Sequence, residues 1–153
     1  MPNLPHPSPA TVAVLVVDDE PDVLDSIVDL LRLELPGVQV WPAGSGPAAL
    51  EVLGRERIDV VLCDHRMPGM DGLEFLIRAR QLAPDAARIL ITAYPELQVA
   101  VRAINEAAIQ SFVTKPVQPG YLVEVVNASI AKARAQAVAQ LADRARSPRH
   151  KAA

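Results

Sequence analysis

Four apolar segments of this chain each end in a polar residue that can take part in chemistry. Residues 58–64 form a nearly continuous apolar run that ends at Asp64 and passes into a loop rich in proline and glycine. This pattern is typical of a buried strand that delivers a carboxylate to the edge of a sheet. The other runs are residues 11–17, which end in Asp18-Asp19-Glu20, residues 88–91, which end at Thr92, and residues 109–114, which end in Lys115-Pro116. If these segments are parallel strands of one sheet, their polar ends meet at its carboxyl edge, where open α/β sheets bind ligands.

Segments with helical spacing alternate with these strands. They run from Pro21 to a stop at Pro36-Gly37, from Pro47 to Leu53 behind a Ser45 cap, from Asp71-Gly72 to a stop before Pro84, from Pro95 to about Ala107, and from near Pro119 past Ile130 toward Arg146. Residues 38–41 alternate and predict one further short strand, with a loop from Pro42 onward. Five strands alternating with five helices predict an α/β fold, in which a parallel sheet is covered by helices on both faces.

The two ends of the chain depart from this pattern. Residues 1–10 are rich in proline, which favours a loose, disordered tail. Residues 132–153 extend the last helix and end in a basic stretch. We therefore expect a tail over residues 1–10, one folded domain over residues 11–131, and an extended C-terminal helix with a basic tail over residues 132–153.

Composition narrows the class of protein. The formal net charge of −3 does not predict direct nucleic-acid binding by this domain, and no apolar run reaches the eighteen or so residues that span a bilayer. Cys63 is the single cysteine, which excludes an intrachain disulfide and a cysteine metal cluster, and its place in an apolar run predicts packing. We expect a soluble, cytoplasmic protein that does not interact with a membrane.

The residues at the strand ends suit phosphoryl transfer. Carboxylate ligands alone, here Asp18, Asp19 and Asp64, favour Mg²⁺ or Mn²⁺ over zinc. Such an ion offsets the mutual repulsion of the acids and allows a phosphoryl group to reach the Asp64 oxygen, which attacks as a carboxylate nucleophile. Lys115 supplies a positive charge and Thr92 a hydroxyl for the phosphoryl oxygens. The neighbouring His65 is interpreted as a surface residue of the loop.

Together with Met67-Pro68-Gly69-Met70-Asp71-Gly72, these residues resemble the receiver domain of two-component response regulators, of the kind found in chemotaxis regulators. The resemblance covers roughly residues 11–130 and implies a flavodoxin-like, doubly wound five-stranded sheet of order 2-1-3-4-5 in three layers. The resemblance implies that Asp64 is the phosphorylated residue and that Asp19 is the main metal ligand, supported by Asp18 and the Arg66 carbonyl. It also implies that Thr92 and Lys115 sense the phosphoryl group and that Phe112 is the switch aromatic. Finally, it implies a cis peptide bond between Lys115 and Pro116.

The resemblance also implies partners and a regulatory role. A sensor histidine kinase or phosphotransfer protein would donate the phosphoryl group, and the only reactions catalysed would be the domain's own phosphoryl transfer and dephosphorylation. The bulky residues Arg66 and Tyr94 predict slow hydrolysis. A flavodoxin-like redox protein is disfavoured by the acidic loop after the first strand, and an aspartate phosphatase by the lack of a capping insertion. The alternative that stays open is an unphosphorylated, receiver-like interaction adaptor.

Two helices carry predictions about the output surface, which we expect on residues 95–107, residues 109–114 and the last helix. In the first of these helices, one stripe is predicted to be core and a smaller alanine stripe is a candidate contact for a partner helix. The core stripe is Leu97, Val101, Ile104 and Ala108, and the alanine stripe is Ala100, Ala103 and Ala107. In the last helix, the apolar spacing continues through Ala133, Ala137, Val138 and Leu141, beyond what the sheet needs. This extension predicts a homodimer contact, a docking arm, or a connector to an output domain.

Overall fold

The computed structural model describes residues 11–93 and 96–146. The elements are β1 (Ala13–Val17), α1 (Pro21–Glu34), β2 (Gln39–Ala43), α2 (Gly46–Arg55), β3 (Val60–Asp64), α3 (Gly72–Leu82), β4 (Ala87–Thr92), α4 (Leu97–Ala107), β5 (Ser111–Thr114) and α5 (Pro119–Arg146). The predictions for residues 1–10, for Tyr94 and for the basic end beyond Arg146 lie outside the described residues.

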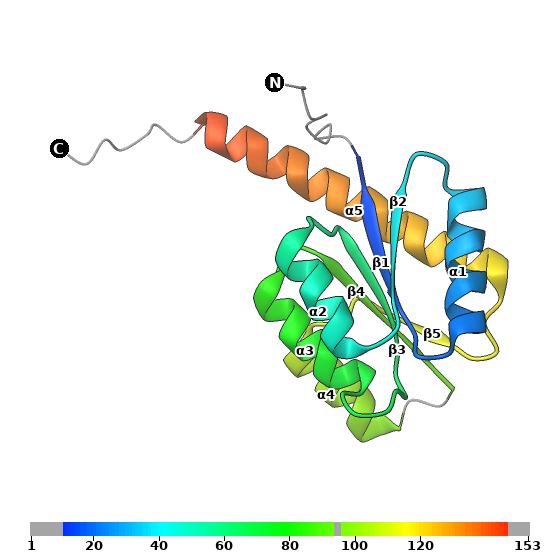
Figure 1. Cartoon of the computed structure of the whole chain (residues 1–153). Coiled ribbons are helices and arrows are strands. Elements are labelled where there is room, and N and C mark those ends of the chain that lie inside the picture. The colour runs from blue at the N-terminus through cyan, green and yellow to red at the C-terminus, as the bar shows by residue number, and fades with distance from the viewer. Residues whose placement is uncertain (1–10, 94–95, 147–153) are drawn as a thin grey trace.

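The strands form one parallel sheet of order β2-β1-β3-β4-β5, which confirms the predicted topology. Helices α1 and α5 cover one face and α2, α3 and α4 cover the other (Figure 1). Successive side chains of β1, β3 and β4 point to opposite faces, and both faces are buried. This two-sided burial explains why these segments are apolar throughout rather than alternating.

Strand β2 is longer than predicted. It continues through Pro42 to Ala43, and Pro42 lies beside Val16 of β1. Proline lacks the N–H group that a central strand needs, but β2 is the edge strand and has a neighbour on one side only. The expectation of a loop from Pro42 onward was therefore wrong.

Helix α4 packs on the stripe opposite to the one predicted. Leu97, Val101 and Ile104 are 80%, 48% and 56% exposed, whereas Ala103 and Ala107 are fully buried. Two apolar stripes run along this helix, and periodicity does not say which of them faces the core. The small alanines let the helix approach its neighbours closely, and the large side chains are left on the surface.

Helix α5 leaves the sheet halfway along its length (Figure 1). Leu122, Val126 and Ile130 are buried, as predicted, whereas Val138 and Leu141 are exposed. The second half of α5 thus projects beyond the layered domain and carries apolar side chains on its surface. Among the described helices, none is both long enough and apolar enough to cross a bilayer.

Arg88 is a buried cation near the start of β4. Its Nε donates to the carbonyl oxygen of Ala107 at 2.7 Å and its Nη1 to that of Ala86 at 2.8 Å. Longer contacts of 3.3–3.5 Å reach the carbonyls of Ala83, Pro84 and Ala108. Burial, followed by the charge of Arg80, lowers the pKa of Arg88 from its usual value. Among the described residues, the groups that stabilise the charge of Arg88 are these carbonyl oxygens.

Arginine side chains satisfy the carboxyl end of α4. Arg80 of α3 donates to the carbonyls of Asn105 and Glu106 at 3.2 Å, and Arg88 donates to those of Ala107 and Ala108. The last four carbonyls of a helix have no partner within it, and cations there also interact favourably with the helix dipole. The helix ends at Ala107, and the residue that caps it, Ala108, has a φ of 48°, which is uncommon for a residue with a side chain.

We predict that Arg88→Met lowers the free energy of unfolding by about 3 kcal/mol, because buried carbonyls lose charged hydrogen-bond donors. Arg80→Met, the matched change at an exposed arginine bound to the same helix end, should cost less than about 1 kcal/mol. Urea unfolding followed by circular dichroism measures both. Equal effects of the two substitutions would contradict the structural role of Arg88.

Candidate functional site

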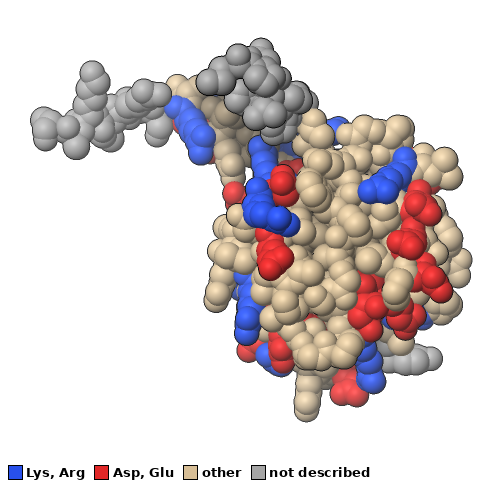
Figure 2. All heavy atoms as spheres, in the orientation of Figure 1, with Lys and Arg blue, Asp and Glu red and all other residues tan. Residues whose placement is uncertain are grey.

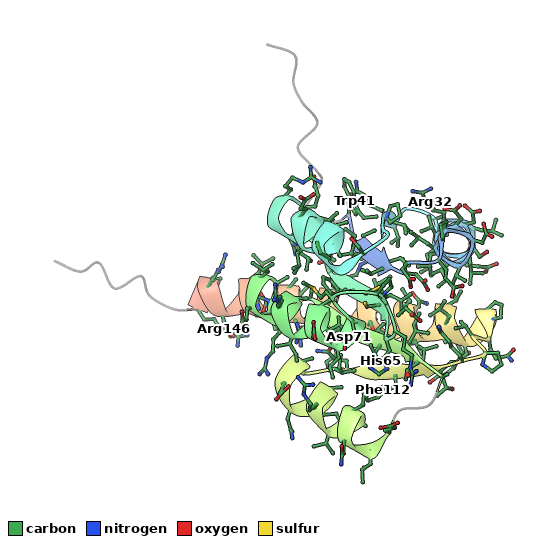
Figure 3. The ribbon with its side chains drawn as sticks, turned by 60° about the horizontal axis from the view of Figure 1, so that its bottom comes forward. Arg32, Trp41, His65, Asp71, Phe112 and Arg146 are labelled. Atoms are coloured by element: carbon green, nitrogen blue, oxygen red, sulfur yellow. The ribbon has the colours of Figure 1, made fainter. Side chains whose placement is uncertain are left out.

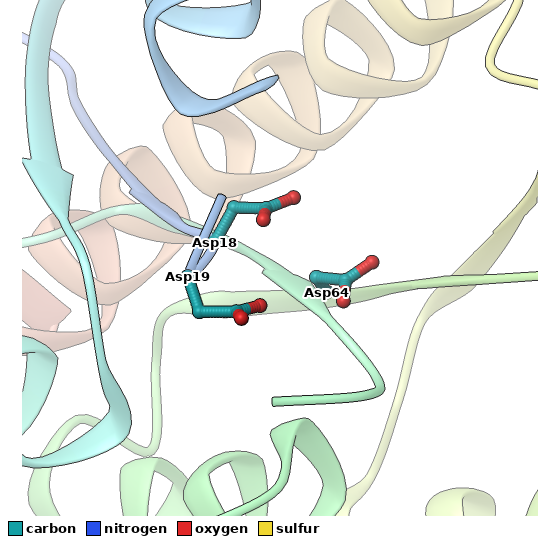
Figure 4. A group of neighbouring side chains, drawn as sticks. All are labelled: Asp18, Asp19 and Asp64. Atoms are coloured by element: carbon teal, nitrogen blue, oxygen red, sulfur yellow. The ribbon is translucent and has the colours of Figure 1, made fainter. Parts of the chain in front are cut away.

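Three carboxylates meet at the carboxyl edge of the sheet. Asp18 and Asp19 follow β1, Asp64 ends β3, and the three side chains point the same way out of the strand ends (Figure 4). Each offers an oxygen atom, and these oxygens all lie within 4.8 Å of one another. Asp18 and Asp64 are both 3% exposed, and Asp19 is half-buried. Adjacent strands β1 and β3 therefore bring together the acids that the sequence predicts at one edge.

The fourth charged group of the site is Lys115, which follows β5. Its Nζ lies 2.5 Å from Asp64 Oδ1, an ion pair without the alignment of a good hydrogen bond. Its backbone N–H donates to the carbonyl of Thr92 at 3.0 Å, which ties the end of β5 to that of β4. The Lys115–Pro116 peptide bond is cis.

The charges of these groups perturb one another. Burial raises the pKa of Asp18, a hydrogen bond from the Glu20 N–H lowers it, and the charge of Asp64 raises it further, so the net shift is upward. Burial opposes the charge on Lys115, but its contact with Asp64 and the charges of Asp64, Asp18 and Glu20 outweigh that effect and raise the pKa of Lys115. The site thus holds more buried negative charge than one ammonium group balances.

This charge balance fits a divalent cation. Three carboxylate oxygens close together, partly exposed through Asp19, are the ligands that Mg²⁺ and Mn²⁺ prefer. The family resemblance also implies the backbone carbonyl of Arg66 as a metal ligand, and Arg66 is an exposed residue in the loop after β3. The donor set therefore suits a hard metal ion.

The loop after β3 is held against the site by close backbone packing. Asp71 caps α3 by accepting from the N–H of Glu74 at 2.9 Å, and Gly69 adopts φ +75°. The N–H of Gly72 donates to the carbonyl of His65 at 2.8 Å, and a Cβ at Gly72 would lie 2.0 Å from the carbonyl oxygen of Asp64. The glycine of the sequence motif is thus required because α3 begins directly against the strand end that carries Asp64.

Thr92 and Phe112 lie on the side of the sheet covered by α3 and α4. Thr92 is buried at the end of β4, and Phe112 of β5 is half-buried against the core of that face. Contrary to its interpretation as a surface residue, His65 is also half-buried, and its Nδ1 lies 3.3 Å from Thr92 Oγ1. Figure 3 labels His65, Phe112 and Asp71. The sequence shows that His65 directly follows the strand, but its contact with Thr92 depends on the register between β3 and β4, which the sequence does not show.

Cys63 belongs to the core, as predicted. It is fully buried in β3, and its thiol contacts the carbonyl of Asp64 at 3.2 Å. Burial, followed by the charge of Asp64, raises the pKa of the Cys63 thiol well above its usual value. The thiol therefore stays protonated and packs.

Known proteins with similar sequences and structures share one domain type. The response regulator receiver domain model matches residues 14–127. The hydrogenase transcriptional regulatory protein HoxA of Bradyrhizobium diazoefficiens is 37% identical over 123 residues, which are 80% of this chain and 25% of HoxA. Sporulation initiation phosphotransferase F of Bacillus subtilis is 36% identical over 86 residues, or 56% of this chain and 68% of that protein.

Solved structures agree with the sequence matches. The CheY-like response regulator receiver domain protein from Methanospirillum hungatei JF-1 gives a TM-score of 0.77 at 29% identity, over 83% of this chain and 99% of that one. The chain spans about a quarter of the length of HoxA and of the transcriptional regulatory protein GlrR of Escherichia coli.

We predict that Asp18→Asn raises the free energy of unfolding of the metal-free protein at neutral pH. Because the folded state raises the pKa of Asp18, the ionised carboxylate destabilises it, and wild-type stability falls as pH rises through the ionisation of Asp18. The variant should lose this pH dependence and most of the increase in Tm that Mg²⁺ gives the wild type.

Asp25→Asn, on the exposed surface of α1, is the matched control and should change neither property. Differential scanning fluorimetry with Mg²⁺ or EDTA measures the metal effect. Equal stabilisation of wild type and Asp18→Asn by Mg²⁺ would show that the carboxylate cluster is not the metal site.

Proposed function

Because this chain belongs to the family of receiver domains of two-component response regulators, we propose that Asp64 accepts a phosphoryl group from a sensor histidine kinase or a phosphotransfer protein. The observation that carries the proposal is the meeting of Asp18, Asp19 and Lys115 around the buried Asp64. The alternative is a receiver-like adaptor that is never phosphorylated. Such an adaptor would not require the carboxylates, Thr92 and Lys115 together, and all of them are present here.

In the proposed reaction, a carboxylate oxygen of Asp64 attacks the phosphorus atom. A phosphorus–oxygen bond forms, and the bond from phosphorus to the donor nitrogen breaks, so that the donor histidine keeps the electron pair. Lys115 is already paired with Asp64 and can follow the negative charge onto the phosphoryl oxygens. Asp18, Asp19, Asp64 and the Arg66 carbonyl would hold Mg²⁺, which when bound supplies positive charge to the phosphoryl oxygens.

The domain would act on itself rather than on a separate substrate. Attack of water on the phosphorus atom of the acyl phosphate would break its bond to the Asp64 oxygen, release inorganic phosphate and return Asp64 to a carboxylate. This hydrolysis would set the lifetime of the signal. Thr92 would donate a hydrogen bond to the phosphoryl group, and Phe112 would respond by a change in burial. The roles of Thr92 and Phe112 follow from the family resemblance together with the positions of these two residues.

The surfaces beside the site suit separate partners. Helix α1 exposes Asp22, Asp25 and Asp29, which contribute to the acidic surface in Figure 2. This acidic side would favour a phosphodonor with a basic surface. On the other side, the exposed Leu97, Val101 and Ile104 of α4 form an apolar strip, which supports an output surface made by α4, β5 and α5.

We predict that wild-type protein incubated with acetyl phosphate and Mg²⁺ gains the mass of one phosphoryl group and that Asp64→Asn gains none. Asp59→Asn, at the opposite end of the same buried segment, is the matched control and should be phosphorylated like the wild type. Intact-mass spectrometry measures all three proteins. A wild type that gains no phosphoryl group would favour the adaptor alternative.

We also propose that the second half of α5 mediates self-association. Val138 and Leu141 lie one helical turn apart and are exposed on the second half of α5. On the same half of α5, Ala133 and Ala137 are half-buried. Val138 and Leu141 are larger than these alanines and more exposed, so they are the apolar groups that a second copy of the chain could contact.

We predict that Leu141→Glu raises the dimer dissociation constant roughly tenfold or more, because the interface would bury an unpaired charge. Gln136→Glu places the same charge about half a turn away from Val138 and serves as the matched control. Light scattering over a range of concentrations measures the association. A wild type that stays monomeric, with and without a phosphoryl mimic, would overturn the proposal.

A further inference from the structure

His65 and Thr92 occupy neighbouring positions on adjacent strands. In the register of β3 and β4, Asp64 lies opposite Ile91, and the His65 N–H extends the pairing by donating to the Ile91 carbonyl at 2.9 Å. His65 therefore lies beside Thr92, one step beyond the end of β3. A residue at this place can reach the Thr92 side chain directly.

The alternation of side chains separates Thr92 from the phosphoacceptor. Leu62, two residues before Asp64, packs on the face covered by α1 and α5. Leu90, two residues before Thr92, packs on the face covered by α3 and α4. Because side chains alternate along a strand, the side chains of Asp64 and Thr92 leave the sheet on opposite faces.

The hydroxyl of Thr92 has one hydrogen-bond partner among the described residues, and that partner is Nδ1 of His65 at 3.3 Å. Thr92 is 4% exposed, so water does not readily replace this partner. The contact fixes the hydroxyl oxygen next to the imidazole, whichever of the two groups donates the hydrogen. The unphosphorylated protein thus holds this hydroxyl away from the side on which Asp64 lies.

From these contacts we propose that His65 is a positioning residue that holds Thr92 in its resting state and sets how readily the phosphorylated state forms. The proposal rests on the function proposed above for Asp64. A phosphoryl group on Asp64 draws the Thr92 hydroxyl toward its oxygens, and this movement breaks the contact with His65. The free energy of that contact therefore opposes formation of the phosphorylated state.

The test uses beryllofluoride with Mg²⁺, because it mimics a phosphoryl group on a carboxylate without a covalent step. His65→Leu removes the ring nitrogens and should bind beryllofluoride about fivefold more tightly than wild type, the effect of one hydrogen bond lost from the resting state. His65→Asn keeps a polar group near the position of Nδ1 and should return the affinity to within about twofold of wild type.

The Thr92→Val background tests whether the effect passes through the hydroxyl. In that background His65→Leu should change the affinity for beryllofluoride by less than about twofold. Unfolding of the wild type, His65→Leu, Thr92→Val and the double variant without metal or mimic gives a second measure, in which His65 and Thr92 should be coupled by about fivefold in the unfolding constant. This measure requires no ligand and applies even if Thr92→Val binds the mimic too weakly to measure.

The outcomes separate the two proposals. If the wild type does not bind beryllofluoride, the proposed function of Asp64 fails, and the unfolding coupling still reports on the contact between His65 and Thr92. If the wild type binds and His65→Leu binds equally or more weakly, the role of His65 fails while the phosphoacceptor function stands. Tighter binding by His65→Leu that persists in the Thr92→Val background would also overturn the role of His65, because its effect would not pass through the hydroxyl.

Discussion

The ion pair between Lys115 and Asp64 is the interaction on which the site depends. It joins β5 to β3 across the intervening β4, and it places one positive charge among three buried or half-buried carboxylates. Without that charge, the repulsion between Asp18 and Asp64 would act in a poorly solvated space. The remaining excess of negative charge would favour a bound divalent cation, which the proposed phosphoryl transfer would also use.

Backbone contacts make this arrangement rigid. The Asp18 N–H donates to the Ala43 carbonyl, the His65 N–H to that of Ile91, and the Lys115 N–H to that of Thr92, so each functional strand end is bonded to a neighbour. Gly72 brings the start of α3 against Asp64. In the proposed phosphorylation, a rigid edge of this kind would restrict the response to a few side chains, among them Thr92, whose hydroxyl bonds to another side chain.

Much of this was predictable from the sequence, because strands buried on both faces are apolar throughout and their polar ends stand out. The strand order, the Ser45 cap and the burial of Leu122, Val126 and Ile130 followed the predictions. Three features did not, for different physical reasons. Pro42 is tolerated because β2 is an edge strand, α4 has two apolar stripes of which either satisfies the spacing, and the contact of His65 depends on register between strands, which a single sequence does not reveal.

The reversed packing of α4 connects the site to the surface. Arg80 and Arg88 bind the carbonyls at its carboxyl end, whereas Glu96 at its amino end makes no side-chain capping bond. Among the described residues, the end that follows Thr92 in the chain therefore has fewer side-chain hydrogen bonds, and it carries Leu97, the most exposed of the three large apolar residues of this helix. In the proposed switch, a movement of Thr92 away from His65 would act first on this end of α4. The energy of the His65 contact would then oppose rearrangement of the apolar strip on α4.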